Sequence, residues 1–403
     1  MRDLVIDGYS LTIRDVVDTG LGLTKVTLSQ SAREKMTSSR EAVTEILNDG
    51  TVTYGINTGF GALSSVSIEP DKLEHLQANL IRSHACGIGE PMEDRHTLMM
   101  MLIRANTLCR GDSGARPVIV DTLISMINHG VCPVIPRIGS LGASGDLAPL
   151  SHLALGMMGE GKCNIRIGTN EWTLMSSKEA LMKSGINPII PAAKEGLSLI
   201  NGTSQMCAFM CEALDNMDIL CFASDASVAC TVEAIRGSHK PFDPRIHNSR
   251  PHPGQIMSAA RISSLLEDSE VKFSHENCDR VQDAYSIRCS PQVHGPVIDM
   301  LRESRRILEI EINSSTDNPL VFTEGDNTEV ISGGNFHGQY IALSSDSISI
   351  ACHELASISE RRINQILDPK WSGHSAFLAN HEGLESGLMI IQYSSAAVLA
   401  ELH

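Results

Sequence analysis

The segment GSLGASGDLAPLSH, which spans Gly139–His152, is the most informative stretch of the sequence. Small residues dominate its first half, so the backbone there can turn tightly and approach other segments closely. If the Gly145 amide nitrogen is pressed against the Ala143 carbonyl carbon, a five-membered ring can close. Loss of water from the ring and from Ser144 then leaves an exocyclic methylidene, a carbon electrophile that unmodified side chains lack. The same pattern predicts a helix with Asp146 as its N-cap, and the alternative to ring closure is a plain loop that holds an anion at that helix N-terminus.

The composition excludes several classes of function. The chain has 403 residues with 32 basic and 48 acidic side chains, which gives a formal charge of −16. Nucleic acid and anionic membranes demand a basic surface, so we expect neither as a partner. No apolar run approaches the ~20 residues that span a bilayer, and the N-terminus lacks the pattern of a signal peptide. The 11 cysteines include no Cys-x-x-Cys pair, which favours free thiols in a reducing, cytoplasmic compartment.

The hydrophobic pattern predicts a mainly α protein. Apolar residues at helical spacing extend over three segments much longer than an average helix, Gln205–Arg236, Val297–Ser315 and Gln339–Leu367. Alternating segments around short turns predict small hairpins at Leu4–Ile13, Cys163–Leu174 and Leu320–Ile331. We therefore expect long helices packed as a bundle, with small β ornaments.

The last segment, Leu388–His403, has the pattern of an apolar helix without a glycine cap, a following proline or a polar tail. Native chains rarely end inside such a helix. We therefore expect the sequence to be truncated at its C-terminal end.

The Gly139–His152 segment resembles the signature of the aromatic amino acid ammonia-lyases, a family that acts on histidine, phenylalanine or tyrosine. In that family an Ala-Ser-Gly tripeptide cyclises autocatalytically into 4-methylidene-imidazol-5-one. The resemblance therefore assigns Ala143, Ser144 and Gly145 to this prosthetic group.

The resemblance also implies the family's L-aspartase-like fold, which is mainly α with a long central helical bundle, small β-hairpins and a loop-rich N-terminal region. We expect residues 1–200 to carry the loop of the catalytic tyrosine and the Ala-Ser-Gly loop, and residues 201–403 to form the central helical bundle. Family members are homotetramers whose active sites draw loops from several subunits, and we expect the same of this chain.

The segment YGINTGFG, Tyr54–Gly61, resembles the family loop that carries the catalytic tyrosine. Tyr54 would remove the substrate β-proton, a task that requires its phenolate to be stabilised. The pair Ser83-His84 resembles the substrate-selectivity position of the histidine-specific branch, where His84 would exchange a hydrogen bond with an imidazole. Tyrosine-specific members can also carry a histidine there. Without the resemblance, Tyr54 is a tyrosine that caps a strand and His84 is a structural histidine.

Two further positions belong to the site by the same resemblance. Asn201, in the stretch EGLSLINGT, would contact the substrate and the modified loop, and its alternative role is a helix cap. Phe336, in the stretch NFHG, would pack beside the prosthetic group.

The segment RVQDAYSIRCSPQ, Arg280–Gln292, is the second long match to the family. Arg288 would bind the substrate carboxylate through a bidentate fork, while Gln282 and Tyr285 would line the site. Tyr285 and Arg288 are three residues apart, so a helical conformation would place them on one face.

We expect neither a metal nor a nucleotide cofactor. His247 and His252 lack the His-x-x-x-His or acidic partner spacing of a zinc site. The sequence contains no phosphate-binding loop of the G-x-x-x-x-G-K or G-x-G-x-x-G type.

Together, these features predict the non-oxidative elimination of ammonia from L-histidine to give trans-urocanate, a step of histidine catabolism. A tyrosine or phenylalanine ammonia-lyase, or an aminomutase with the same prosthetic group, remains an alternative. Histidine-specific members continue past the position of His403 with a Gln-Glu-Asp-His motif. The alternative to an enzyme is therefore an inactive, truncated homologue with a structural or assembly role.

Overall fold

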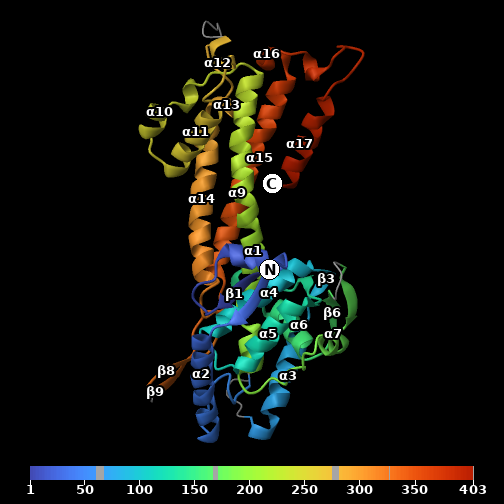
Figure 1. Cartoon of the computed structure of the whole chain (residues 1–403), viewed down its shortest axis with the longest axis vertical. Coiled ribbons are helices and arrows are strands. Elements are labelled where there is room, and N and C mark those ends of the chain that lie inside the picture. Colours follow the sequence, from blue (N-terminus) through green and yellow to red (C-terminus); the bar gives the residue numbers. More distant parts are fainter. Residues whose placement is uncertain (60–67, 167–170, 275–280, 326, 403) are drawn as a thin grey trace. The chain divides into compact units, whose positions relative to one another are not determined.

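The computed structural model describes residues 1–59, 68–166, 171–274, 281–325 and 327–402. The chain divides into two compact units, Met1–Asp215 with Ile307–Leu343, and Asn216–Arg306 with Ser344–His403. Three long helices contribute residues to both units, namely α9 (Ser204–Ala234), α14 (Ser290–Glu311) and α15 (Gln339–Leu367). Two of them match the long segments expected from the hydrophobic pattern closely, whereas α14 both begins and ends several residues before the predicted Val297–Ser315. The mainly α prediction is confirmed (Figure 1).

Helix α4 (Asp94–Cys109) forms the centre of the first unit. All residues from His96 to Cys109 are buried, the polar Arg104 and Asn106 included, so the helix is enclosed around its whole circumference. Three helices pack against it, α1 (Ile13–Gly20), α2 (Gln30–Asn48) and α5 (Pro117–His129). Three more helices pack against one another, α3 (Leu73–His84), α6 (Leu147–Met157) and α8 (Glu195–Ile200). Three of the segments expected to form the site, those of His84, of the Ala-Ser-Gly loop and of Asn201, begin or end in this second group.

The predicted N-terminal hairpin at Leu4–Ile13 is wrong. Strand β1 (Arg2–Ile6) pairs in parallel with β2 (Thr24–Leu28), and α1 connects the two. The chain turns into α1 because Thr12 and Asp15 form a capping box, in which each side chain binds the other residue's backbone N–H. The alternation of apolar and polar residues identifies a strand, but it does not show which other strand is its neighbour.

The two other predicted hairpins are confirmed. Strands β6 (Lys162–Ile165) and β7 (Thr173–Ser176) are antiparallel, as are β8 (Leu320–Glu324) and β9 (Asn327–Ile331). Their expected turn residues Gly168, Thr169, Asn170 and Asp326 lie outside the described residues. The remaining short elements of this unit are β3 (Ile88–Pro91), β4 (Val131–Pro133), β5 (Pro136–Ile138), α7 (Ser177–Lys183), η2 (Pro70–Lys72) and η3 (Gly142–Ser144).

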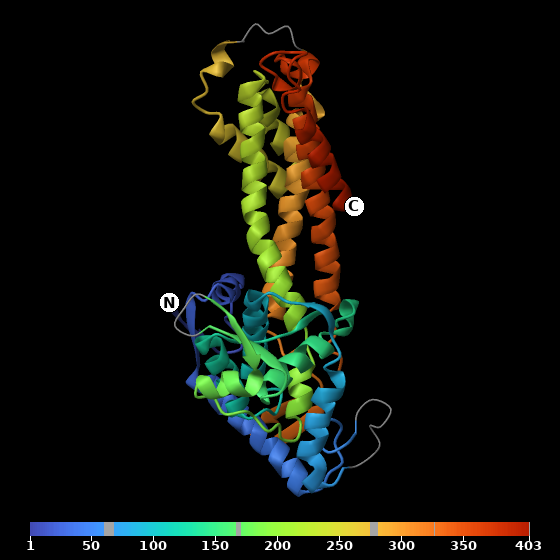
Figure 2. The ribbon, with the colours of Figure 1, turned by 90° about the vertical axis from the view of Figure 1, so that its right-hand side faces the viewer.

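In the second unit α9, α14 and α15 run side by side, as both views show (Figures 1 and 2). Val228 and Val232 of α9, with Ile235 just beyond its end, form a buried cluster with Phe242, Ile262 and Ile287 from shorter segments. Asp225 of α9 accepts hydrogen bonds from Ser258 Oγ at 2.5 Å and from His294 Nδ1 at 2.8 Å, which joins α9 to two neighbours. The shorter elements of this unit are η4 (Lys240–Phe242), α10 (Pro244–Asn248), α11 (Pro253–Leu265), α12 (Val271–Ser274), α13 (Tyr285–Arg288), α16 (Pro369–Ser372), η5 (Ala376–Leu378) and α17 (Met389–Glu401). Within the described ranges, no helix combines the length and apolarity needed to cross a membrane.

Candidate functional site

The small-residue loop 139–146 packs against two other backbone segments in the first unit. Gly145 has φ 96° and ψ 171°, a conformation that essentially only glycine adopts. A Cβ atom at Gly145 would lie 3.0 Å from the Phe336 carbonyl oxygen and 3.2 Å from that of Gly202. The position therefore requires glycine both for its conformation and for the close approach of its neighbours.

Hydrogen bonds fasten this loop on both sides of the Ala-Ser-Gly tripeptide. The Gly338 N–H donates to the Ala143 carbonyl oxygen at 2.8 Å, and the Asp146 N–H donates to the Gly202 carbonyl oxygen at 2.9 Å. Ser140 Oγ donates to the Gly145 carbonyl oxygen at 3.2 Å. The loop is thus held between residues that are distant in sequence.

The prediction that Asp146 is the N-cap residue of the helix is confirmed for α6 (Leu147–Met157). Its side chain, however, makes no capping bond to that helix. Its Oδ2 instead accepts from the backbone N–H groups of Gln205 at 2.7 Å and Met206 at 3.1 Å, in the first turn of α9. Burial raises the pKa of Asp146 to about 6, against the lowering effect of these hydrogen bonds and of Arg104. The carboxyl group therefore fastens the end of the loop to the start of α9.

Tyr54 is half-buried and begins a turn that rests on two neighbouring segments. Gly55 has φ 75°, and a Cβ atom there would lie 2.8 Å from Pro319 Cδ and 2.9 Å from Leu197 Cδ2. Asn57 braces the turn, since its Oδ1 accepts from the Thr53 N–H at 2.8 Å. Phe60 and Gly61 of the matched motif lie outside the described residues.

Asn201 lies at the C-terminal end of α8, and its backbone N–H closes that helix on the Leu197 carbonyl oxygen. Its buried amide Nδ2 donates to the Asn318 carbonyl oxygen at 3.0 Å. The next residue is Gly202, the partner of the Ala-Ser-Gly loop. Asn201 therefore caps the end of α8 and not the start of a helix, the cap that its sequence Asn-Gly-Thr suggests, since α9 begins only at Ser204.

His84 is the last residue of α3 and is half-buried. Its Nδ1 lies 2.9 Å from the Leu80 carbonyl oxygen. Ser83 Oγ lies 3.0 Å from the same nitrogen. A carbonyl oxygen only accepts, so the contact with Leu80 is a hydrogen bond in the tautomer that carries its proton on Nδ1, and in that tautomer Nε2 is a hydrogen-bond acceptor. Just beyond His84, the Gly87 N–H donates to His152 Nε2 at 3.1 Å, and a Cβ atom on Gly139 would lie 3.3 Å from Gly87 Cα. The end of α3 thus adjoins both the start of the small-residue loop and α6.

Close contacts therefore link most of the expected first-unit site residues in one continuous series of segments: the Tyr54 turn, Pro319, Asn201 with Gly202, the loop 143–145, and Phe336. Phe336 itself is half-buried.

The other three expected site residues belong to the second unit. The stretch from Tyr285 to Arg288 is helical (α13), which was the condition for the two residues to share a face, and the Arg288 guanidinium carbon lies 4.3 Å from the centre of the Tyr285 ring. Tyr285 is 69% exposed and Gln282 is also exposed, so both are available to a ligand or to another chain. Arg280 of the matched stretch lies outside the described residues.

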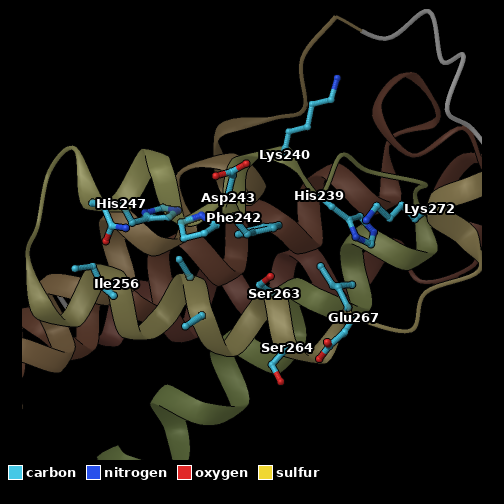
Figure 3. A pocket seen from close by; sticks show the side chains of 15 residues that line it. His239, Lys240, Phe242, Asp243, His247, Ile256, Ser263, Ser264, Glu267 and Lys272 are labelled. Carbon is cyan, nitrogen blue, oxygen red and sulfur yellow. The ribbon is translucent and has the colours of Figure 1, made fainter.

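The second unit also contains a hollow of about 650 Å³ between the segments around α10, α11 and α12 (Figure 3). Lys240, Asp243 and Glu267 line it together with two histidines, His239 and His247. None of the expected site residues lines this hollow. Both ring nitrogens of His247 have hydrogen-bond partners, the Pro241 carbonyl oxygen at 3.0 Å and Gln255 Nε2 at 3.0 Å, which suits a structural histidine.

Comparisons with known proteins agree on one family. The family model described as aromatic amino acid lyase matches residues 11–403. The chain is 46% identical to a histidine ammonia-lyase of Myxococcus xanthus, over 99% of this chain and 77% of the relative. It is also 46% identical to a histidine ammonia-lyase of Caldanaerobacter subterraneus, over 100% and 77% of the two chains.

Solved structures give the same result. Histidine ammonia-lyase from Trypanosoma cruzi is similar with a TM-score of 0.90 and 41% identity, covering 100% of this chain and 74% of that one. A phenylalanine aminomutase from Pantoea agglomerans has a TM-score of 0.92 at 34% identity, covering 100% and 80%.

Proposed function

The chain belongs to the aromatic amino acid lyase family, and from this premise we propose that it is a histidine ammonia-lyase, which converts L-histidine to trans-urocanate and ammonia. The observation that carries the proposed chemistry is the loop at Gly145, with its glycine-only conformation and its two backbone neighbours within 3.2 Å of a missing Cβ atom. The choice of L-histidine is supported by the relatives at 46% identity and by the Nε2 acceptor of His84.

Ala143, Ser144 and Gly145 would form 4-methylidene-imidazol-5-one, and the loop fits this group. The Gly338 N–H polarises the Ala143 carbonyl, whose carbon the Gly145 nitrogen must reach. The bonds of Asp146 and Ser140 restrict the far end of the tripeptide, which lowers the entropy cost of closing a ring. The group supplies a carbon electrophile that ordinary side chains lack.

The chain's own residues would bind and orient the substrate and move its proton. Tyr54 takes the β-proton, and Asn201 with Tyr285 positions the reacting centre. Arg288 pairs with the carboxylate, and Gln282 lines the site beside it. Nε2 of His84 would accept a hydrogen bond from the N–H of a substrate imidazole. A phenyl ring has no N–H group to donate this bond.

Phe336 would pack beside the prosthetic group, to which its carbonyl already lies close. We also propose a cytoplasmic homotetramer in which loops of several subunits complete each site, and no nucleic acid or membrane partner. Residues 1–200 would supply the catalytic tyrosine loop and the Ala-Ser-Gly loop, and residues 201–403 the helical bundle.

The aminomutase structures give a second candidate, because they share the fold at a TM-score of 0.92. Purified protein offered L-histidine, L-phenylalanine and L-tyrosine separately decides between them. Urocanate from L-histidine alone supports the proposal, whereas cinnamate, coumarate or a β-amino acid without urocanate refutes it.

Intact mass tests the prosthetic group separately. Ring closure with two dehydrations lowers the mass by about 36 Da. A folded chain with neither this loss nor ammonia release would support the alternative of an inactive homologue.

A further inference from the structure

A fully buried ion pair lies beneath the segments of the proposed site in the first unit. Lys194 Nζ and Asp317 Oδ2 are 2.7 Å apart, and both side chains have 0% exposure. Lys194 immediately precedes α8 and has φ 75°, an unusual conformation for a residue with a side chain. A positive charge is unfavourable at a helix N-terminus, and a buried charge without a partner is costly, so Asp317 is a required counter-ion.

Asp317 is ionised in this setting. Burial raises the pKa of the carboxyl, but the charges of Lys194 and Arg104, together with the hydrogen bonds from Lys194 and the Asn318 N–H, hold the pKa below its usual value. Lys194 Nζ also donates to Ser198 Oγ at 2.9 Å, one turn along α8. The pair therefore fixes the helix that ends at Asn201.

Asp317 reaches the proposed site through the next residue. Its Oδ1 accepts from the Asn318 N–H at 2.6 Å, and the Asn318 carbonyl oxygen accepts from Asn201 Nδ2 at 3.0 Å. The side chain of Asn318 accepts from the Gly333 N–H at 2.7 Å, at the start of the segment that leads to Phe336. The Asp317 carboxylate thus orients Asn318, whose carbonyl oxygen accepts the hydrogen bond of the Asn201 amide.

The same segment supports the turn of Tyr54. Pro319 follows Asn318, and its Cδ would lie only 2.8 Å from a Cβ atom at Gly55. On the other side of Gly55 lies Leu197 of α8, the helix that Lys194 precedes. A shift of Lys194 or Asp317 would therefore displace Leu197 or Pro319, the two residues that pack against the Tyr54 turn at Gly55.

We propose that Lys194 and Asp317 are positioning residues for the ammonia-lyase reaction, which set the Asn201 amide and the Tyr54 turn at their working positions. Neither side chain is exposed, so neither touches substrate, and both act through Asn318 and Pro319. The inference rests on the proposed function, since it concerns turnover at that site.

A double-mutant cycle between Asp317 and Asn201 tests the proposal. Asp317→Asn keeps the shape of the side chain and removes its charge. We expect kcat for L-histidine to fall about 100-fold, the effect of a small misplacement of reacting groups, with KM changed less than about threefold. In the Asn201→Ala background the same substitution should lower kcat by clearly less than in the unaltered chain, because one of the two groups through which it acts is already absent.

Two readouts accompany the cycle. Intact mass should show that the Asp317→Asn chain still undergoes ring formation, since the bonds that fasten loop 143–145 do not involve Asp317. Asp121→Asn is the matched control, because it removes the same charge from an ion pair with Arg33 at 2.6 Å between α2 and α5. Its kcat should equal that of the unaltered chain.

Equal losses of kcat in both backgrounds would overturn the inference, as would an Asp317→Asn chain that is folded but fails to lose about 36 Da. If Asp317→Asn does not fold, the neutral pair Lys194→Met with Asp317→Asn replaces it in the cycle and must show the same dependence on Asn201. An unaltered chain that releases no ammonia from L-histidine would refute the proposed function together with this inference. An active unaltered chain with equal losses in both backgrounds refutes the inference alone.

Discussion

Gly145→Ala should slow the formation of the prosthetic group. The backbone at Gly145, with φ 96° and ψ 171°, lies in a region that side chains hardly permit. The new methyl group would also lie 3.0 Å from the Phe336 carbonyl oxygen and 3.2 Å from the Gly202 carbonyl oxygen. The Gly202 oxygen is the acceptor of the Asp146 N–H, so its displacement would loosen the loop as well.

The size of the effect follows from the backbone conformation. Holding a residue with a side chain in such a region costs ~1–3 kcal/mol. Since about 1.4 kcal/mol corresponds to a tenfold change in rate, ring closure should slow by roughly 5- to 150-fold. The close contacts add to this cost.

A time course of intact mass after cell-free synthesis measures ring closure directly. The unaltered chain should lose about 36 Da, and the Gly145→Ala chain should retain that mass at times when the unaltered chain has reacted fully. Gly142→Ala is the matched control in the same loop. Gly142 has φ 50°, which costs an L residue only ~1–2 kcal/mol, and a Cβ atom there would meet nothing within 4 Å. Equal rates for Gly145→Ala and the unaltered chain would refute the reasoning.

Three further substitutions test separate parts of the proposed site. Tyr54→Phe removes the phenol oxygen, so kcat for L-histidine should fall ~10²–10⁴-fold while intact mass still shows the ring; an unchanged kcat would contradict the role of Tyr54 as base. His84→Leu removes the Nε2 acceptor, so kcat/KM for L-histidine should fall at least about 100-fold relative to that for L-phenylalanine, and a constant ratio would contradict its role in substrate choice. Burial raises the pKa of Asp146 from 3.8 to about 6, so the unaltered chain should gain stability relative to Asp146→Asn as the pH falls from about 6 to about 4. This gain in the free energy of unfolding reaches up to ~3 kcal/mol and is lost as the pH rises again through 6. Denaturant unfolding of the two proteins between these pH values measures it, and a constant difference in their unfolding free energies would contradict it.

The long helices were predictable because their signal is local. Apolar residues at helical spacing over Gln339–Leu367 predict α15 with its observed bounds, and those over Gln205–Arg236 predict α9 within two residues. The hairpins β6–β7 and β8–β9 were likewise predictable, because a short turn leaves each strand only one near partner. The pairing of β1 with β2 was not, since the strand that borders β1 comes after a whole helix.

The residue types of the proposed site, and the family that they indicate, could be inferred from the sequence alone. Tyr54, His84, Asn201 and the tripeptide 143–145 stand in motifs whose residue types can be read along the chain. The sequence alone did not show how those groups are held. Lys194 and Asp317 are 123 residues apart and stand out in no motif, yet they form a fully buried ion pair. Such contacts depend on the tertiary structure, because a buried charge or carboxylate pairs with whichever group the packed chain brings close to it. The spacing of two residues along the sequence carries no information about the distance between them in space.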